Sequence, residues 1–171
     1  MINKEIEKKL NKQINLEFWS SQLYLSMSAY FSAKGLPGFA HWMFIQYQEE
    51  LTHAMKFFNY LIERGGKVTL APIASVNTDW ASTIDVFIET QAHEKEVTEK
   101  IYQLTDTAVA NRDHATQSML RWFIDEQVEE EANVKAIIDT LNLVQDNGYA
   151  IYGLDKELAT RVFVDSTQAA P

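Results

Sequence analysis

The feature that most constrains the fold is a set of four long stretches with helical periodicity, separated by very few chain breakers. The 171 residues include only six glycines and three prolines, and most of these are clustered. The pattern predicts helices over residues 3–34, 37–64, 80–110 and 113–146, and a short fifth helix over 155–163. Helices of globular proteins average about 11–12 residues, so four helices of about 30 residues indicate a helical bundle.

The connections between these stretches predict how the helices are joined. Gly35 suits the position just after a helix end, and Pro37 suits the first turn of the next helix. A second short turn falls at 110–116, so the first two helices and the last two helices form antiparallel pairs. The passage 64–80 is long enough to run the length of a bundle. The sequence therefore predicts an all-α four-helix bundle with one long crossover and a short fifth C-terminal helix that starts near Asp155.

Composition narrows the class of protein. A chain of 171 residues with 46% apolar residues predicts a single domain, residues 1–171, with its own core. It has no cysteine, and no stretch approaches the roughly 18 apolar residues of a spanning helix, so we expect a cytoplasmic protein without a membrane partner. The net charge of −9 argues against a nucleic-acid partner and favours attraction of cations.

Each predicted long helix carries one glutamate within its apolar stripe. In the first helix, Glu17 lies three residues after Ile14 and seven before Tyr24. In the second, Glu50 lies seven residues before Phe57, and a histidine follows at the next turn. The remaining core-facing polar residues, found by the same spacing, are His53, Glu94, Gln127 and Glu130.

Four carboxylates facing one core need a source of positive charge. Burial of an ion costs several kcal/mol, and neighbouring carboxylates raise one another's pKa values. Two divalent cations would balance the combined charge of −4, and the imidazole of the histidine would be an additional ligand. The expected ligand set is Glu17, Glu50, His53, Glu94 and Glu130. Carboxylates with a single imidazole suit iron or manganese better than zinc or copper. The spacing therefore predicts a dinuclear metal site.

Other residues near these positions allow more than one interpretation. Tyr24 is either an ordinary core tyrosine or a partner of a metal-ligating carboxylate. An acidic group of Glu49, Glu126 and Glu129 is either a solvated surface or the ligand set of a third ion. We interpret the remaining histidines as surface residues or ordinary polar contacts: His41, His93 and His114.

The residues assembled above resemble those of the ferritins, and in particular the bacterial non-haem ferritins. The resemblance covers nearly the whole chain and runs through "NLEFWSSQLYLSMSAY", "QEELTHAMKFFNYL", "HEKEVTEKI", "EQVEEE" and "LDKEL". It implies a first iron site of Glu17, Glu50 and His53, in which Glu50 bridges, and a second of Glu94 and Glu130 with Gln127 nearby. It also implies a third iron site of Glu49, Glu126 and Glu129, with Glu130 shared, and a site tyrosine at Tyr24.

The resemblance also implies an activity. Members of the family oxidise Fe2+ with dioxygen and store Fe3+ as a mineral inside a shell of twenty-four subunits. The expected function is iron storage with ferroxidase activity, and no haem is expected. Many di-iron oxidases have a second E-x-x-H motif, whereas this chain has Gln127-x-x-Glu130, so we expect the second iron to be held less firmly.

Two other functions remain open from the sequence. One is a di-iron oxidoreductase that acts on peroxide or an organic substrate without storing iron. The other is a helical interaction module without catalysis, in which the buried acids are protonated. An interaction module should bind no Fe2+, whereas both metal proteins should bind it. Assembly into a large shell would indicate an iron-storage protein rather than a small oxidase.

Overall fold

The computed structural model describes residues 2–145 and 147–168, and these residues are all-α. The long helices are α1 (Lys4–Ala33), α2 (Pro37–Glu63), α3 (Thr83–Ala110) and α4 (His114–Val144). They are followed by α5 (Gly148–Leu158) and a single 3-10 turn, η1 (Ser166–Gln168). Within the described residues there is no strand, and none of the helices has the length and apolar composition that crossing a bilayer requires.

The chain forms two compact units. The first contains residues 11–79 together with the C-terminal part of the chain, and thus most of α1, all of α2 and α5. The second contains residues 2–10 and 80–145, and thus the first turns of α1 with α3 and α4. The single-domain organisation over 1–171 stays a prediction, and residue 146, the last of the predicted fourth helix, lies outside the described residues.

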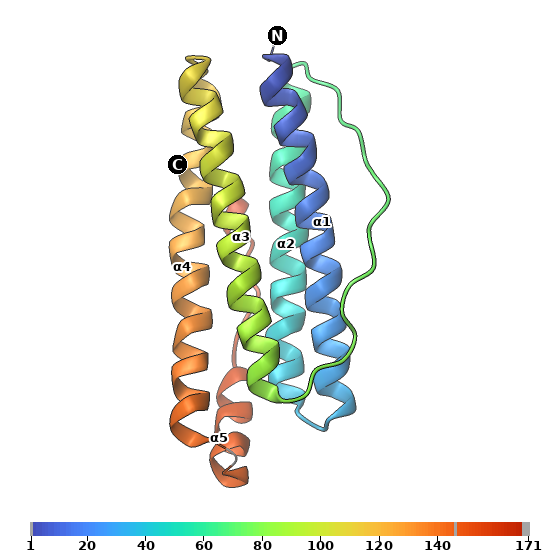
Figure 1. Ribbon diagram of the computed structural model, residues 1–171, viewed down its shortest axis with the longest axis vertical. Helices are drawn as coiled ribbons and strands as arrows, with labels where there is room; N and C mark the ends of the chain where they lie inside the picture. The colour runs from blue at the N-terminus through green and yellow to red at the C-terminus, as the bar shows by residue number, and fades with distance from the viewer. Residues whose placement is uncertain (1, 146, 169–171) are drawn as a thin grey trace. The chain divides into compact units, whose positions relative to one another are not determined.

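In the first unit, α1 and α2 form an antiparallel hairpin (Figure 1). Gly35 has a φ of 73°, and the N–H groups of Gly35 and Leu36 donate to carbonyl oxygens of the last turn of α1, at 3.2 and 3.0 Å. Glycine takes this left-handed conformation without the steric cost that a Cβ would bring. Pro37 then opens α2. The predicted helix end and restart are therefore confirmed.

The passage after α2 runs back along α1 as an extended segment, residues 64–79 (Figure 1). Two asparagines of α1 act as pairing partners for its backbone. Asn11 donates to the carbonyl oxygen of Lys67 and accepts from the N–H of Thr69. Asn15 bonds in the same way to Thr69 and Ala71. These side chains satisfy backbone groups that have no helix or sheet to bond to.

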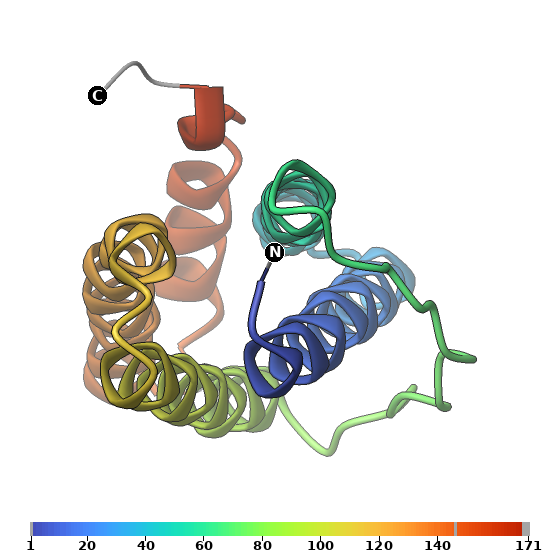
Figure 2. The same cartoon turned by 90° about the horizontal axis from the view of Figure 1, so that it is seen from above.

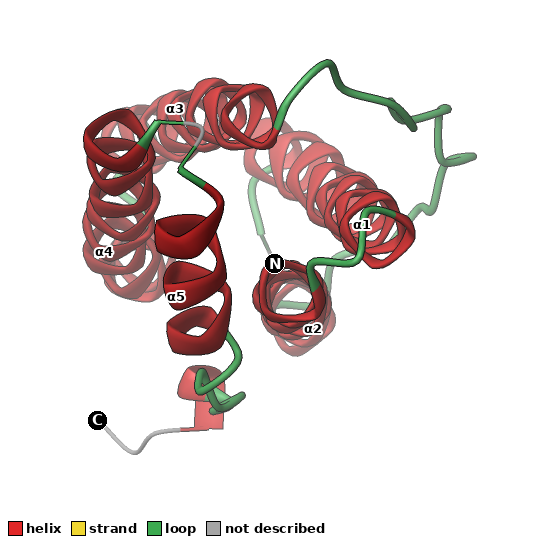
Figure 3. Ribbon diagram, turned by 90° about the horizontal axis from the view of Figure 1, so that it is seen from below, coloured by secondary structure: helices red, strands yellow, loops and turns green. Residues whose placement is uncertain are grey.

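The fifth helix begins earlier than the sequence predicts, at Gly148 rather than at 155, and ends at Leu158 (Figure 3). Asn147 is its N-cap, because its Oδ1 accepts from the N–H groups of Tyr149 and Ala150, both at 3.1 Å. Asp155, which the sequence marks as a helix start, instead lies inside α5. The predicted short fifth helix is therefore present, but its predicted bounds, 155–163, are wrong.

Asp155 caps a different helix. Its Oδ1 accepts hydrogen bonds from the N–H groups of Gly38 and Phe39, at 2.7 and 3.1 Å, whereas the N-cap residue of α2, Leu36, makes no side-chain cap bond. The backbone of α5 comes so close that a Cβ on Gly38 would lie 1.6 Å from the carbonyl oxygen of Asp155. This contact fixes α5 against the start of α2.

In the second unit, α3 and α4 form a second hairpin (Figure 2). Ser82 caps α3 by accepting from the N–H of Asp85, and Asp113 caps α4 by accepting from the N–H of Thr116. At the turn, Asn111 accepts a hydrogen bond from the side chain of Asn3, at 2.8 Å. Apolar side chains line one face of each helix, and the buried polar residues Glu94, Gln127 and Glu130 lie on the same face.

Candidate metal centre

Three possible metal ligands meet in the first unit, between α1 and α2. Glu17 comes from the middle of α1, and Glu50 and His53 lie one turn apart on α2. These three residues are 1%, 2% and 3% exposed. One ligand atom of each lies within 4.8 Å of the others, which is close enough for a single ion to contact all three. The helical spacing predicted this burial.

Within this group, Nδ1 of His53 lies 3.7 Å from Oε2 of Glu50. Oε1 of Glu17 accepts a hydrogen bond from Nε2 of Gln13 at 2.8 Å, whereas its buried Oε2 accepts none from the described residues. Burial, and then the nearby carboxylate of Glu50, raise the pKa of Glu17 well above its ordinary value of 4.5. His53 and Gln13 act in the opposite direction but are the smaller effects. A cation bound here would remove the cost of keeping both carboxylates ionised.

A second polar group lies in the second unit, between α3 and α4. Its members are almost fully buried and come from the core faces of the two helices: Glu94, Gln127 and Glu130. Nε2 of Gln127 donates to Oε2 of Glu94 at 3.1 Å, and it also lies 3.2 Å from Oγ1 of Thr98. The amide therefore orients the carboxylate of Glu94. Because the two groups belong to different units, their union in one dinuclear site stays a prediction.

The buried tyrosine of α1 and the predicted third group have different environments. Tyr24 is fully buried, and its part in the site stays a prediction. Glu126 is half-buried and Glu129 is exposed. Glu49 is half-buried, and its Oε2 accepts a hydrogen bond from Nη2 of Arg161 at 2.6 Å. Sequence reasoning missed Arg161, because a residue 112 positions away leaves no periodic signal beside Glu49.

One of the remaining histidines is not at the surface. His93 of α3 is 7% exposed, and burial lowers its pKa to about 4, against the opposite effect of Glu96 and Glu89. Of the two interpretations given for His93, a surface residue or an ordinary polar contact, burial excludes the first, which rested only on the angle between His93 and Glu94 around the helix. His41 is half-buried and donates from Nε2 to the carbonyl oxygen of Arg161 at 2.8 Å, and His114 is exposed.

Comparison with known proteins agrees with this architecture. A family model described as "Ferritin-like domain" matches residues 7–144. A bacterial non-heme ferritin of Bacteroides fragilis is 43% identical over 161 residues, which is 94% of this chain and 100% of that protein. A bacterial non-heme ferritin of Staphylococcus saprophyticus is 39% identical over 166 residues, covering 97% of this chain and 99% of that protein.

Solved structures give the same result. An open pore ferritin of the archaeon Archaeoglobus fulgidus superimposes with a TM-score of 0.94 at 42% identity, over 95% of this chain and 100% of that chain. A structure described as a humanized archaeal ferritin gives a TM-score of 0.95 at 43% identity, over 96% and 99%. The predicted fold class, a four-helix bundle with one long crossover and a short fifth helix, is thereby confirmed. The chain belongs to the ferritin family and is similar to its bacterial non-haem members.

Proposed function

We propose that this protein stores iron and is a ferroxidase, which oxidises Fe2+ with dioxygen at a dinuclear site and keeps Fe3+ as a mineral inside a shell of its own subunits. The observation that carries the proposal is the buried group of Glu17, Glu50 and His53, whose ligand atoms lie within 4.8 Å of one another. Membership of the ferritin family supports the storage function, and the resemblance to that family supplies the number of twenty-four subunits.

The ligand set favours iron for chemical reasons. Two carboxylates and one imidazole in the first group, and two carboxylates and an amide in the second, form an oxygen-rich environment without thiolates. Two Fe2+ ions would balance four ionised glutamates, so binding offsets both causes that raise the pKa of Glu17, first its burial and then the repulsion from Glu50. The iron here is substrate and cargo, and no haem takes part in the proposal.

Each residue has a proposed part. Glu17 and His53 hold the first iron, and Glu50 bridges the two irons. Glu94 and Glu130 hold the second iron, and Gln127 orients Glu94 through the 3.1 Å hydrogen bond. Because an amide is a weaker donor to iron than an imidazole, the second iron is held less firmly than a histidine ligand would hold it. In addition, we propose a third iron site of Glu49, Glu126, Glu129 and Glu130, and a supporting part for Tyr24.

The reaction takes two electrons from two Fe2+ ions and two protons from solvent water. Each Fe2+ gives one electron to dioxygen, which is reduced by two electrons and takes up two protons to form hydrogen peroxide. The glutamates hold the two ions at a fixed separation before and after this step. Fe3+ is the harder Lewis acid, so it binds hydroxide more strongly than Fe2+ does, and hydrolysis draws it towards the mineral. We propose that this takes place in the cytoplasm, with neither nucleic acid nor membrane as a partner.

The test is aerobic addition of Fe2+ to the metal-free protein, followed by size-exclusion chromatography with iron analysis of each fraction. We expect rapid formation of Fe3+ and co-elution of many irons per subunit with a particle of several hundred kilodaltons. Rapid oxidation without retained iron in a small particle would instead indicate a di-iron oxidoreductase that stores none. Failure to bind Fe2+ would leave only a helical interaction module.

A further inference from the structure

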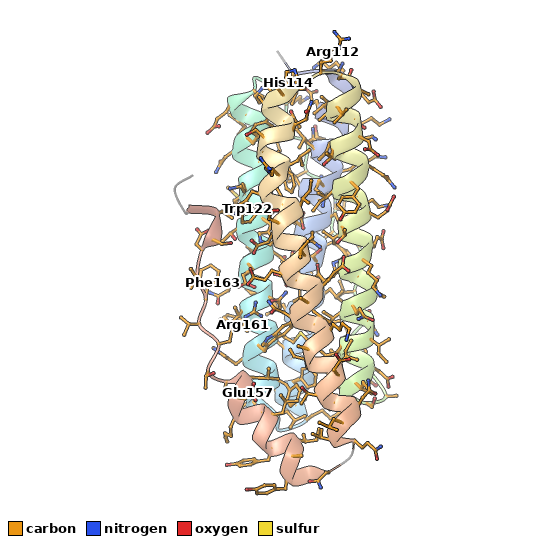
Figure 4. All side chains as sticks on the ribbon, turned by 90° about the vertical axis from the view of Figure 1, so that its left-hand side faces the viewer. Arg112, His114, Trp122, Glu157, Arg161 and Phe163 are labelled. Carbon is orange, nitrogen blue, oxygen red and sulfur yellow. The ribbon has the colours of Figure 1, made fainter. Side chains whose placement is uncertain are left out.

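Arg161 lies in the segment that follows α5 and reaches back to the side of α2 (Figure 4). Its Nη2 donates to Oε2 of Glu49 at 2.6 Å, and its guanidinium carbon lies 4.6 Å from the ring centroid of Trp42. Its carbonyl oxygen accepts from Nε2 of His41 at 2.8 Å. Three residues of one face of α2 therefore hold a single arginine of the C-terminal segment.

This ion pair is shielded from water. The side chains of Arg161 and Glu49 are 20% and 15% exposed, and Trp42 beneath them is buried. A charge-assisted hydrogen bond at such a place is stronger than one between exposed side chains. Nη1 of Arg161 is buried and has no hydrogen-bond partner among the described residues, so the guanidinium is held mainly through Glu49 and the aromatic ring.

Arg161 occupies Oε2 of Glu49, which is one of the two oxygens that this carboxylate could offer to a metal ion. A cation that takes Oε2 as a ligand must displace Nη2, because an oxygen coordinating a metal at about 2.0–2.5 Å leaves no room for an arginine nitrogen of like charge at hydrogen-bond distance. Breaking the ion pair costs free energy, so the metal ion binds more weakly than it would in the absence of Arg161.

We propose that Arg161 is a positioning residue that competes with metal ions for Glu49 and so weakens the proposed third iron site relative to the proposed dinuclear site. The inference rests on the proposed function, in which Glu49 is a ligand of the third ion. When an ion binds there, Arg161 leaves the ring of Trp42, and the segment 159–168 loses one of its attachments to α2. Further attachments include the bond from His41 and a long bond, 3.4 Å, from Lys56 to the carbonyl oxygen of Thr167.

The first test is calorimetric titration of the metal-free assembled protein with Zn2+, which cannot be oxidised and so separates binding from ferroxidation. We expect R161Q to bind the ion that depends on Glu49 about tenfold to a hundredfold more tightly than the wild type, the ratio that corresponds to a hydrogen bond to a charged group. R161K, which keeps the charge, should stay close to the wild type.

Controls assign the effect to this pair. K156Q removes a charge from exposed Lys156 of α5, which contacts Tyr152 and not Glu49, and should leave the zinc affinities unchanged. We call zinc binding that depends on Glu49 the weak class, and zinc binding at the proposed dinuclear site the tight class. E49Q should abolish the weak class, and the zinc affinity of E49Q/R161Q should be no higher than that of E49Q. Equal affinities in R161Q and the wild type, or a gain that persists in the double variant, would overturn the proposal.

The second test follows Trp42 directly. Zn2+ bound at Glu49 should change the tryptophan fluorescence in the concentration range of the weak class, and W42F should lack this change. A wild-type titration in which the weak class fills with no change attributable to Trp42 would contradict displacement of Arg161. Loss of the tight class, by contrast, would count against the dinuclear site and thus against the proposed function.

Discussion

Gln127 donates a hydrogen bond from Nε2 to Oε2 of Glu94 over 3.1 Å, and both side chains are buried. The pair joins α3 to α4 at the level of the proposed second iron. It shows how a neutral side chain takes part in a site built from carboxylates: the amide fixes a ligand in place without adding charge.

Replacing Gln127 by leucine should weaken binding of the second Fe2+ by about tenfold, since a hydrogen bond to a charged group contributes about 1.5–3 kcal/mol. Binding of the first Fe2+ should change little. Anaerobic equilibrium titration with Fe2+ measures both. The matched control is Q103L, because Gln103 makes the same kind of bond to Glu99 on the exposed face of α3, at 3.0 Å. Equal loss in both variants would mean that the bond to Glu94 has no particular effect on iron.

Replacing His53 by alanine should slow the rapid oxidation of a small dose of Fe2+ by at least about ten- to a hundredfold, the range found even for partners that only support a ligand. Stopped-flow absorbance of the ferric product measures the rate. H114A removes an exposed histidine from the start of α4 and should behave like the wild type. Wild-type speed in H53A would show that the first iron is held elsewhere.

The raised pKa of Glu17 predicts how the metal-free protein responds to pH. For an acid whose pKa is higher in the folded than in the unfolded protein, stability is greatest below the unfolded value, about 4.5, and is lost as pH rises towards the folded value. Glu17→Gln keeps the shape and removes the charge, so at neutral pH the metal-free variant should melt at least about 2–4 °C higher, the shift that 1 kcal/mol produces in a chain of this size.

Melting curves in the presence of a chelator, at pH 5 and pH 7.5, test this. The difference between Glu17→Gln and the wild type should grow with pH, and added Zn2+ should stabilise the wild type more than the variant. E5Q, at an exposed position of α1, provides the control for the charge change alone. A difference that is constant across pH would indicate that Glu17 titrates alike in the folded and unfolded protein.

The contact between Gly38 and Asp155 predicts unequal effects of two glycine substitutions. A Cβ at Gly38 would lie 1.6 Å from the carbonyl oxygen of Asp155, so G38A should cost about 1–3 kcal/mol or more, as overpacking does. A Cβ at Gly153 meets no atom within 4 Å, so G153A should be neutral or gain up to about 1 kcal/mol. D155A, which removes the cap of α2, should cost about 1 kcal/mol. Thermal or urea unfolding ranks the three, and equal stability of G38A and G153A would contradict the close approach.

The sequence by itself determined the long helices and the residues on their inner faces. A buried helix face repeats every 3.6 residues, so apolar neighbours such as Ile14 and Phe57 were enough to predict that Glu17 and Glu50 are buried. The turn at Gly35 could also be predicted from local sequence, because glycine is the residue type that most readily adopts the left-handed conformation.

Only the tertiary structure decided which distant residues meet. Asp155 has the local sequence of a helix cap, yet it caps α2, 117 residues earlier, and Asn147 caps α5 instead. Arg161 reaches Glu49 across 112 residues. The physical reason is that both contacts are made by single side chains in non-repeating surroundings. Their partners are therefore selected by the path of the backbone rather than by any local periodicity.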